Sequence, residues 1–328
     1  MTNKKITLNA SKIFLFVMIM SVLACKDAKK EKSTEEATTE EIEEAKAPFF
    51  KLSLAQWSIH KQIWEGADPY SFAQKANEWG FTGLEYVSQL YNKELEAANY
   101  SEEAMAAFVE KCNAESKKYG MQNVLIMVDG QGDLATTDAA VRKAAVENHY
   151  KWVDAAAAMG CHAIRVNLSG SDVAEEWKAS AVDGLSMLAT YAKDKNINVI
   201  VENHGGLSSN AKMLASVMAE VNMDNCGTLP DFGNFCIKRS ADGCAEMYDY
   251  YQGVKELMPY AKSVSAKSYN FDEEGNETEL DYRKLLQIVK DAGYTGFIGV
   301  EYEGNDLSEA DGILATKELL INASKDLK

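Results

Sequence analysis

The feature that most constrains the fold of this chain is a regular alternation of short apolar runs with longer amphipathic segments. The apolar runs are five or six residues long, and several are almost continuously hydrophobic, as strands are when both faces are covered. The pattern predicts parallel strands at residues 52–57, 83–87, 123–128, 162–167, 198–203, 226–231, 263–268 and 297–302.

The segments between these strands carry helix start and stop signals. Residues 69–80 begin with proline and end with glycine, and residues 101–120 begin with a capping box and end with glycine. Two further segments end at Gly160 and Gly293. Eight strands alternating with about eight helices predict an α/β fold of the (β/α)8 TIM barrel type over residues 49–328.

A doubly wound open sheet is the alternative arrangement. It requires a glycine-rich phosphate-binding turn after the first strand, and the sequence LAQWSIHKQIW at residues 54–64 contains no glycine. The barrel is therefore favoured. In such barrels the active site lies at the carboxyl ends of the strands, so the polar residues at those ends are the candidate functional residues.

The N-terminal segment has the pattern of an export signal. Lysines at positions 4, 5 and 12 precede an apolar run at 13–24, and Val22-Leu23-Ala24-Cys25 resembles a bacterial lipobox. Residues 1–25 are thus predicted to be a lipoprotein signal peptide with Cys25 as the lipidated residue, or else an ordinary signal peptide with a coincidental cysteine. Residues 26–48 are highly charged and predict a disordered tether. We expect an exported protein on the periplasmic face of the outer membrane, which contacts membrane only through its lipid.

The formal net charge of −16 argues against nucleic acid as a partner, because no dense basic cluster occurs after the tether. The sequence gives no indication of the oligomeric state. The spacing of the cysteines that follow Cys25 matches no disulfide or metal framework, so we expect buried free thiols at Cys112, Cys161, Cys226, Cys236 and Cys244.

Acidic residues close three of the last four predicted strands. Glu202, Asp231 and Glu301 each follow an apolar run, and the barrel brings these strand ends to one mouth. Three carboxylates in so small a volume require a cation between them, and a hard divalent ion with oxygen ligands is the simplest one. His204 is expected to share a face with Glu202, because side chains alternate along a strand.

Four segments resemble the last four strands of the xylose isomerase-like barrels, the sugar phosphate isomerase/epimerase group. They are VIVENHGG at 199–206, TLPDFGNF at 228–235, VSAKSYNFD at 264–272 and GFIGVEYEG at 296–304. The resemblance covers residues 50–325. It implies one divalent metal ion (Mn, Mg, Co or Zn) held by Glu, Asp, His and Glu from successive strands.

Glu202, Asp231 and Glu301 match three of these four ligands, and Ser265 stands where the family places its histidine. A second family histidine is replaced by Asn234. His204 or water is expected to complete the ligand set.

The resemblance further implies a small-molecule sugar substrate and proton abstraction next to its carbonyl, through an enediolate. Glu202 and Glu301 would be the acid/base pair, and Lys267 would neutralise the developing alkoxide. The residues expected to bind the sugar are Trp57, His60, Glu85, Arg165, Asn167, Asn234 and Glu303. Several of these have a purely structural alternative, such as an ion pair of Glu202 or Glu301 with Lys267 or Arg165.

Three functions follow from these residues. The first is a metal-dependent isomerase or epimerase of a keto-sugar. The second is a lyase or dehydratase that acts on 3-keto-sugars or keto-glycosides at the same site. The third is a non-catalytic sugar-binding lipoprotein with a degenerate metal site. The DNA-repair endonucleases of the superfamily are rejected, because they need many histidines and this chain has four.

Overall fold

The structure is a computed structural model that describes residues 47–325 and 327–328. The signal peptide predicted over residues 1–25, with Cys25, lies outside these ranges, as does the charged segment up to residue 46. Within the described ranges, no helix has both the length and the apolar character that crossing a bilayer requires.

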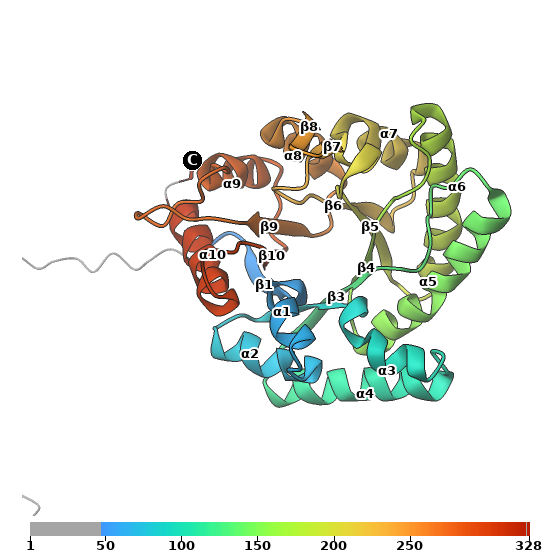
Figure 1. Ribbon diagram of the computed structural model, residues 1–328, viewed down its shortest axis with the longest axis horizontal. Coiled ribbons are helices and arrows are strands. Elements are labelled where there is room, and N and C mark those ends of the chain that lie inside the picture. Colours follow the sequence, from blue (N-terminus) through green and yellow to red (C-terminus); the bar gives the residue numbers. More distant parts are fainter. Residues whose placement is uncertain (1–46, 326) are drawn as a thin grey trace, which may run out of the picture. The chain divides into compact units, whose positions relative to one another are not determined.

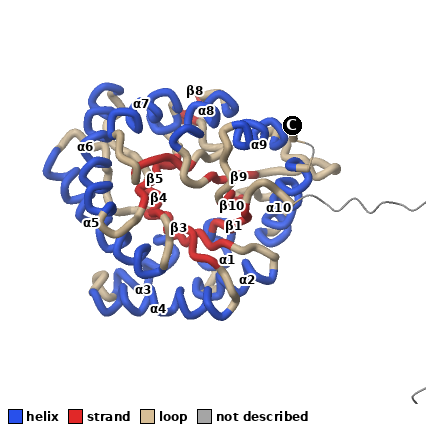
Figure 2. Tube along the Cα trace, turned by 180° about the vertical axis from the view of Figure 1, so that it is seen from behind, coloured by secondary structure: helices blue, strands red, loops and turns tan. Residues whose placement is uncertain are grey.

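All eight predicted strands are present and form one parallel sheet in the order β6-β5-β4-β3-β2-β1-β10-β9. The sheet curls into a ring with the helices outside it (Figures 1 and 2). Its strands are β1 Lys51–Ala55, β2 Gly83–Val87, β3 Gln122–Val128, β4 Ala163–Val166, β5 Asn198–Glu202, β6 Cys226–Leu229, β9 Val264–Ser268 and β10 Phe297–Tyr302. This is the predicted (β/α)8 barrel.

The two ends of the sheet meet just beyond β6. The amide of Ser265 donates to the carbonyl of Pro230 (3.0 Å), and the amide of Phe232 donates to the carbonyl of Ser265 (3.1 Å). Asp231 and Ser265 are therefore parallel neighbours at this seam.

The helices connect successive strands, and the end signals at Ser101 and Gly160 form caps, although Ala104 leaves the predicted capping box without its acidic partner. The Ser101 hydroxyl accepts from the amide of Ala104 (3.3 Å), and Gly160 ends α5 with a φ of +72°. The α-helices are α1 His60–Trp64, α2 Phe72–Glu78, α3 Asn92–Ala97, α4 Glu102–Lys118, α5 Ala139–Met159, α6 Ala174–Lys193, α7 Ala211–Val221, α8 Tyr250–Leu257, α9 Tyr282–Asp291 and α10 Glu309–Ser324. Short 3-10 turns are η1 Gln56–Ile59, η2 Pro69–Ser71, η3 Ser88–Tyr91, η4 Gly206–Ser209 and η5 Met258–Tyr260.

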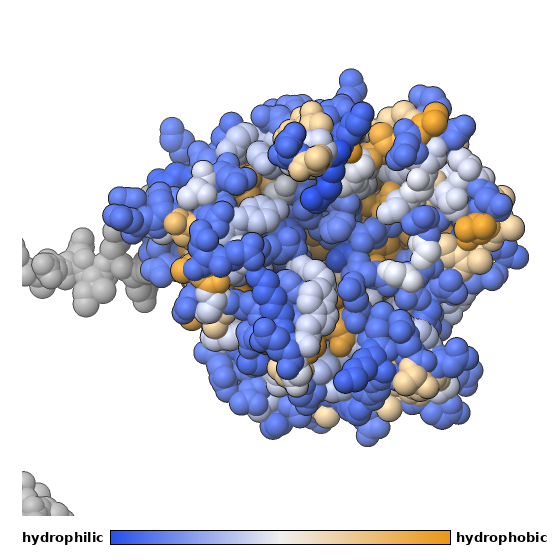
Figure 3. All heavy atoms as spheres, viewed as in Figure 1, coloured by the Kyte–Doolittle hydropathy of each residue, from blue (hydrophilic) through white to orange (hydrophobic). Residues whose placement is uncertain are grey.

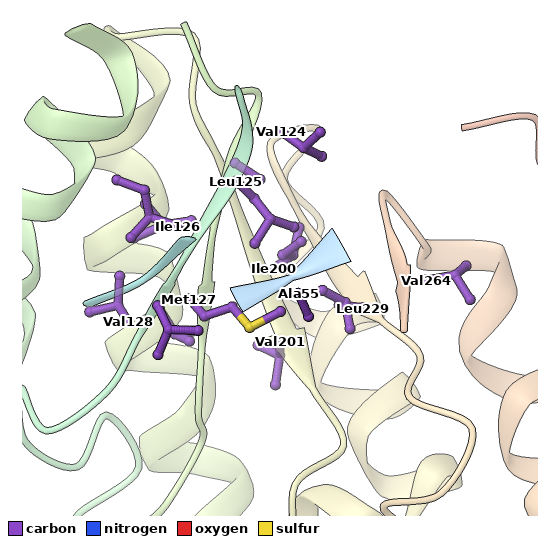
Figure 4. Close-up of a cluster of buried hydrophobic side chains, with 14 of the residues drawn as sticks. Ala55, Val124, Leu125, Ile126, Met127, Val128, Ile200, Val201, Leu229 and Val264 are labelled. Atoms are coloured by element: carbon purple, nitrogen blue, oxygen red, sulfur yellow. The ribbon is translucent and has the colours of Figure 1, made fainter. Parts of the chain in front are cut away.

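The strands are apolar on both faces because they separate two buried layers. Along β3, Leu125 and Met127 point toward the strands across the barrel, whereas Ile126 and Val128 point toward the helices (Figure 4). All four are almost completely buried. Hydrophilic side chains dominate the face of the molecule seen in Figure 3, where apolar ones are scattered.

A two-stranded antiparallel hairpin, β7 Cys236–Ser240 and β8 Gly243–Met247, was not predicted. It lies between β6 and α8, and a disulfide joins Cys236 to Cys244. The prediction of free thiols is therefore wrong for this pair, because both cysteines lie on one exposed hairpin rather than in the core. It is confirmed for Cys112, Cys161 and Cys226, which are buried and unpaired.

Candidate active site

Three carboxylates from three strand ends meet at one point inside the barrel mouth. Glu202 is the last residue of β5, Asp231 follows β6, and Glu301 lies on β10. One oxygen from each lies within 4.8 Å of the others, and all three side chains are buried. The structure thus brings together the acidic residues that the sequence placed at strand ends.

Asp231 is fixed by hydrogen bonds from its own loop. Its Oδ1 accepts from the amides of Gly233 and Asn234 (both 2.8 Å), and its amide donates to Oδ1 of the buried Asn203 (2.8 Å). The Asn234 side chain also donates to Glu202 (2.8 Å). Asn234 therefore links two of the three carboxylates.

Ser265 occupies the centre of the cluster. Its hydroxyl lies 2.7 Å from Oδ2 of Asp231 and 2.9 Å from Oε2 of Glu301. A hydroxyl has only one proton, so it donates to one carboxylate at a time. The residue that replaces the family histidine thus touches two candidate metal ligands.

Two buried cations accompany the carboxylates. Nζ of Lys267 lies 3.2 Å from Glu301, 3.1 Å from Glu303 and 3.9 Å from Asp231. Nε of Arg165 lies 2.9 Å from Glu202, and its Nη1 donates to Asp129 (2.7 Å). The Arg165 Nε contact is an ion pair by distance that lacks hydrogen-bond geometry. We therefore treat it as charge compensation rather than as a directed bond.

Burial is the largest single influence on the pKa values of these carboxylates. Burial raises the pKa of Asp231 to about 8, against the opposing effect of Lys267. Burial likewise raises the pKa of Glu301. Burial alone would also raise the pKa of Glu303, but the charge of Lys267 and its hydrogen bond outweigh this effect and lower that pKa. The cluster thus has carboxylates that hold protons more tightly than usual.

Glu85, predicted to bind substrate, lies on β2 deeper in the barrel. One of its carboxylate oxygens accepts from Ser53 (2.6 Å), and the other is buried with no hydrogen-bond partner among residues 47–325. The Glu85 carboxylate packs directly against Gly299. Any side chain at position 299 would collide with it, because a Cβ there would lie 2.4 Å from a carboxylate oxygen. Burial raises the pKa of Glu85 to about 8.

This shift predicts how the stability of the metal-stripped protein depends on pH. The folded state binds the Glu85 proton more tightly than the unfolded state, whose pKa is near 4.5. The contribution of Glu85 to the free energy of unfolding is therefore fully present below pH 4.5 and is lost as the pH rises through about 8. Glu85→Gln should lose less stability than the parent between about pH 5 and about pH 9 in urea unfolding. Identical losses in both proteins would contradict the assignment.

The remaining predicted residues lie around the mouth. Asn167 donates to Asp129 (2.8 Å), and its own carbonyl oxygen is buried without a partner. The ring of His60 stacks on Trp57 with 4.3 Å between centroids, and Trp57 lies next to Glu303, whose pKa it lowers. These side chains border the carboxylate cluster from both sides.

His204 does not face the cluster as expected. Strand β5 ends at Glu202, so the alternation that predicted a shared face stops there, and His204 is exposed. Its ring is absent from the group of ligand atoms around Glu202. It lies near the mouth, within electrostatic range of Asp129 and Glu303.

Two residues at the site were not singled out from the sequence. Asn203 holds the Asp231 loop through three hydrogen bonds, and Ser53 holds Glu85. Asn203 directly follows Glu202, so an amide next to a strand-end carboxylate was the available signal. Ser53 gave none, because a serine within a strand is common.

The donor set fits a divalent cation. Carboxylate oxygens are the ligands that hard ions prefer, and three lie close enough to share one ion. Arg165 and Lys267 bring two positive charges against the four carboxylates of Glu202, Asp231, Glu301 and Glu303. When all four carboxylates are ionised, these two positive charges do not balance them. The buried acidic triad could therefore hold a metal.

The sequence profile of the family described as Xylose isomerase-like TIM barrel matches residues 73–322. The chain belongs to this family. Among curated relatives, the C-glycoside deglycosidase alpha subunit of Arthrobacter globiformis is 36% identical over 66 residues, which are 19% of this chain and 19% of the relative. The 3'-dehydrocarminate deglycosidase alpha subunit of a Microbacterium species is 44% identical over 48 residues, 15% and 14% of the two chains. The chain thus matches less than a fifth of these relatives' length.

Solved structures of similar fold cover nearly the whole barrel. A D-tagatose 3-epimerase-like protein has a TM-score of 0.62 at 18% identity, covering 84% of this chain and 97% of its own. A zinc-bound IOLI protein has a TM-score of 0.63 at 13% identity, covering 85% and 99%. The 3-keto-D-glucoside 4-epimerase of E. coli has a TM-score of 0.60 at 13% identity, covering 83% and 99%. At these identities the likeness establishes the fold of this xylose isomerase-like barrel.

Proposed function

We propose that this protein abstracts the proton next to the carbonyl of a 3-keto-glycoside and eliminates the group attached to the anomeric carbon. The observation that carries the proposal is the buried pair of Glu202 and Glu301 beside the ammonium of Lys267. The deglycosidase names of the curated relatives support elimination as the outcome.

The reaction is balanced within the substrate. The C2–H bond lies next to the C3 carbonyl, so loss of its proton to a carboxylate gives an enediolate. The enediolate electrons then form the C1–C2 double bond, and the bond from C1 to its substituent breaks. The substituent leaves with that electron pair and takes up a proton. No oxidant or reductant is consumed.

Glu301 is the better placed base. Its Oε2 contacts Ser265 and Lys267, whereas its Oε1 has no hydrogen-bond partner within residues 47–325. Oε1 of Glu202 accepts from the Asn234 side chain and its Oε2 lies 2.9 Å from Nε of Arg165, so both of its oxygens are already engaged. Glu301 therefore has a free oxygen and a raised pKa, as a group that takes up a proton requires.

Lys267 serves both the base and the substrate. Its ammonium holds Oε2 of Glu301 and Oε1 of Glu303, and it is buried among them. A buried positive charge near the reacting carbon also stabilises negative charge that develops on a sugar oxygen. Glu202, Asp231 and Glu301 would hold a divalent ion (Mn, Mg, Co or Zn), which would supply further positive charge for the same purpose.

Epimerisation of a keto-sugar is the second candidate. Like the elimination, it begins with loss of a proton next to the carbonyl. It then returns a proton to the opposite face of the same carbon, and Glu202 is the second carboxylate available for that step. The 3-keto-D-glucoside 4-epimerase is one of the proteins of similar fold. A non-catalytic sugar-binding protein is the third candidate, favoured by Ser265 in the histidine position.

Proton NMR of a 3-keto-glucoside incubated with the purified domain distinguishes the three candidates. Release of the free aglycone together with an unsaturated sugar is the expected result. A new epimer with the aglycone retained would favour epimerisation. Binding without any chemical change, with each of the four metal ions added in turn, would contradict both enzymatic functions.

We also propose export and lipid anchoring at Cys25, as the N-terminal sequence predicts. The disulfide between Cys236 and Cys244 supports this proposal, because disulfides persist mainly in oxidising compartments.

A further inference from the structure

A cavity of about 330 Å³ opens beside the carboxylate cluster. Two of its lining residues contact the cluster directly. Asn234 donates to Glu202, and Glu303 pairs with Lys267. Its other walls are the hairpin β7–β8 and the loops that follow β9 and β10. A group attached to a sugar at the cluster would therefore extend into this cavity.

The hairpin is held in place by its base and by its disulfide rather than by a core of its own. Its β8 strand is exposed throughout, and it lies beside α8 (Figures 1 and 2). At its base Phe235 is fully buried against Tyr250 and against Gly253, where any Cβ would lie 2.1 Å from the Phe235 ring. An isolated two-stranded hairpin is marginally stable, so the disulfide fixes a wall that packing alone would not hold.

The cavity walls combine aromatic, apolar and cationic groups. Tyr250 and Tyr269 are half-buried in it, and Met247 presents an apolar side chain that is 47% exposed. Arg239 also lines it, and its guanidinium makes no ion pair or hydrogen bond with any residue that the structure describes. Tyrosine and methionine favour a flat ring, and a guanidinium stacks on such a ring or binds its oxygen substituents.

We infer that this cavity is the subsite for the leaving group, and that the leaving group is a single aromatic ring carrying hydroxyl substituents. The inference rests on the proposed function. The volume is at the lower end of the roughly 300–1,000 Å³ of small-molecule pockets, which suits one ring rather than a long saccharide. A free keto-monosaccharide would leave the subsite empty.

Two substrates that differ only in this group provide the test, a hydroxyphenyl and a methyl 3-keto-glucoside. We expect the parent to bind the aryl compound at least about tenfold more tightly in calorimetry. Arg239→Ala should remove most of that preference and change the Kd of the methyl compound by less than about twofold. The exposed neighbour Lys238, which does not line the cavity, supplies the matched control Lys238→Ala. The double variant Cys236→Ser/Cys244→Ser should weaken aryl binding in the same selective way.

The outcomes separate this inference from the proposed function. Deuterium uptake from D2O by the methyl compound reports proton abstraction alone and should be unchanged in Arg239→Ala. Equal Kd values for the two compounds in the parent, or equal effects of Arg239→Ala on both, would overturn the subsite whether or not turnover occurs. Selective aryl binding without deuterium uptake or aglycone release would support the subsite and overturn the proposed function.

Discussion

Glu301→Gln is expected to lower kcat on a 3-keto-glycoside by about 10²–10⁴-fold, the contribution usual for a positioned acid or base. The amide cannot accept the proton from carbon, and its shape leaves the Ser265 and Lys267 contacts nearly in place. Glu202→Gln should cause a loss of similar size in the same assay. Steady-state rates of aglycone release measure both effects.

Circular dichroism of both variants should match the parent, because glutamine fits the space of glutamate. The matched control is Glu274→Gln, at an exposed position after β9, which should leave kcat unchanged. If Glu301→Gln kept more than about a third of the parent's kcat, Glu301 would not be the base that takes the proton from carbon.

Lys267→Met is expected to lower the free energy of unfolding by about 3–5 kcal/mol and also to abolish turnover. The substitution keeps the length of the side chain but removes a buried ammonium that faces Glu301, Glu303 and Asp231. Asp231 and Glu301 then remain buried without their nearest cation, which is a larger cost than the loss of the ion pair itself. Urea unfolding at neutral pH measures the change.

The double variant Lys267→Met/Glu301→Gln tests the cause. It has one negative charge fewer beside the lost cation, so it should regain part of the stability that Lys267→Met loses. Equal stability of Lys267→Met and the parent would show that Lys267 does not compensate the cluster. Equal losses in the single and double variants would show that the cost comes from packing rather than from charge.

Much of the barrel was predictable because the information lies in short stretches of sequence. The apolar residues 199–201 predict a buried strand, and the barrel rule then places its terminal Glu202 at the mouth. Asp231 and Glu301 follow from the same rule. Those predictions needed no knowledge of any contact distant in sequence.

The remaining features depend on contacts that no local pattern records. Strand β8 is exposed, β7 is exposed over its last three residues, and neither carries an apolar alternation, so neither they nor their disulfide could be read from residues 236–247. His204 points away from the cluster because β5 ends at Glu202, one residue before the end predicted from the sequence. The contact of Lys267 with Asp231 depends on closure of the barrel between β6 and β9, which brings Asp231 and Ser265 together.

Solvent isotope exchange tests the central claim most directly. The parent domain, supplied with each of manganese, magnesium, cobalt and zinc in turn, is incubated with a 3-keto-glucoside in D2O, and deuterium at C2 is followed by NMR. The account predicts deuterium at C2 of the recovered substrate. If release is faster than exchange, it predicts instead that aglycone release from a substrate already deuterated at C2 shows a primary isotope effect. Neither result is expected with Glu301→Gln. Unlabelled, intact substrate under all four conditions would contradict proton abstraction at this site.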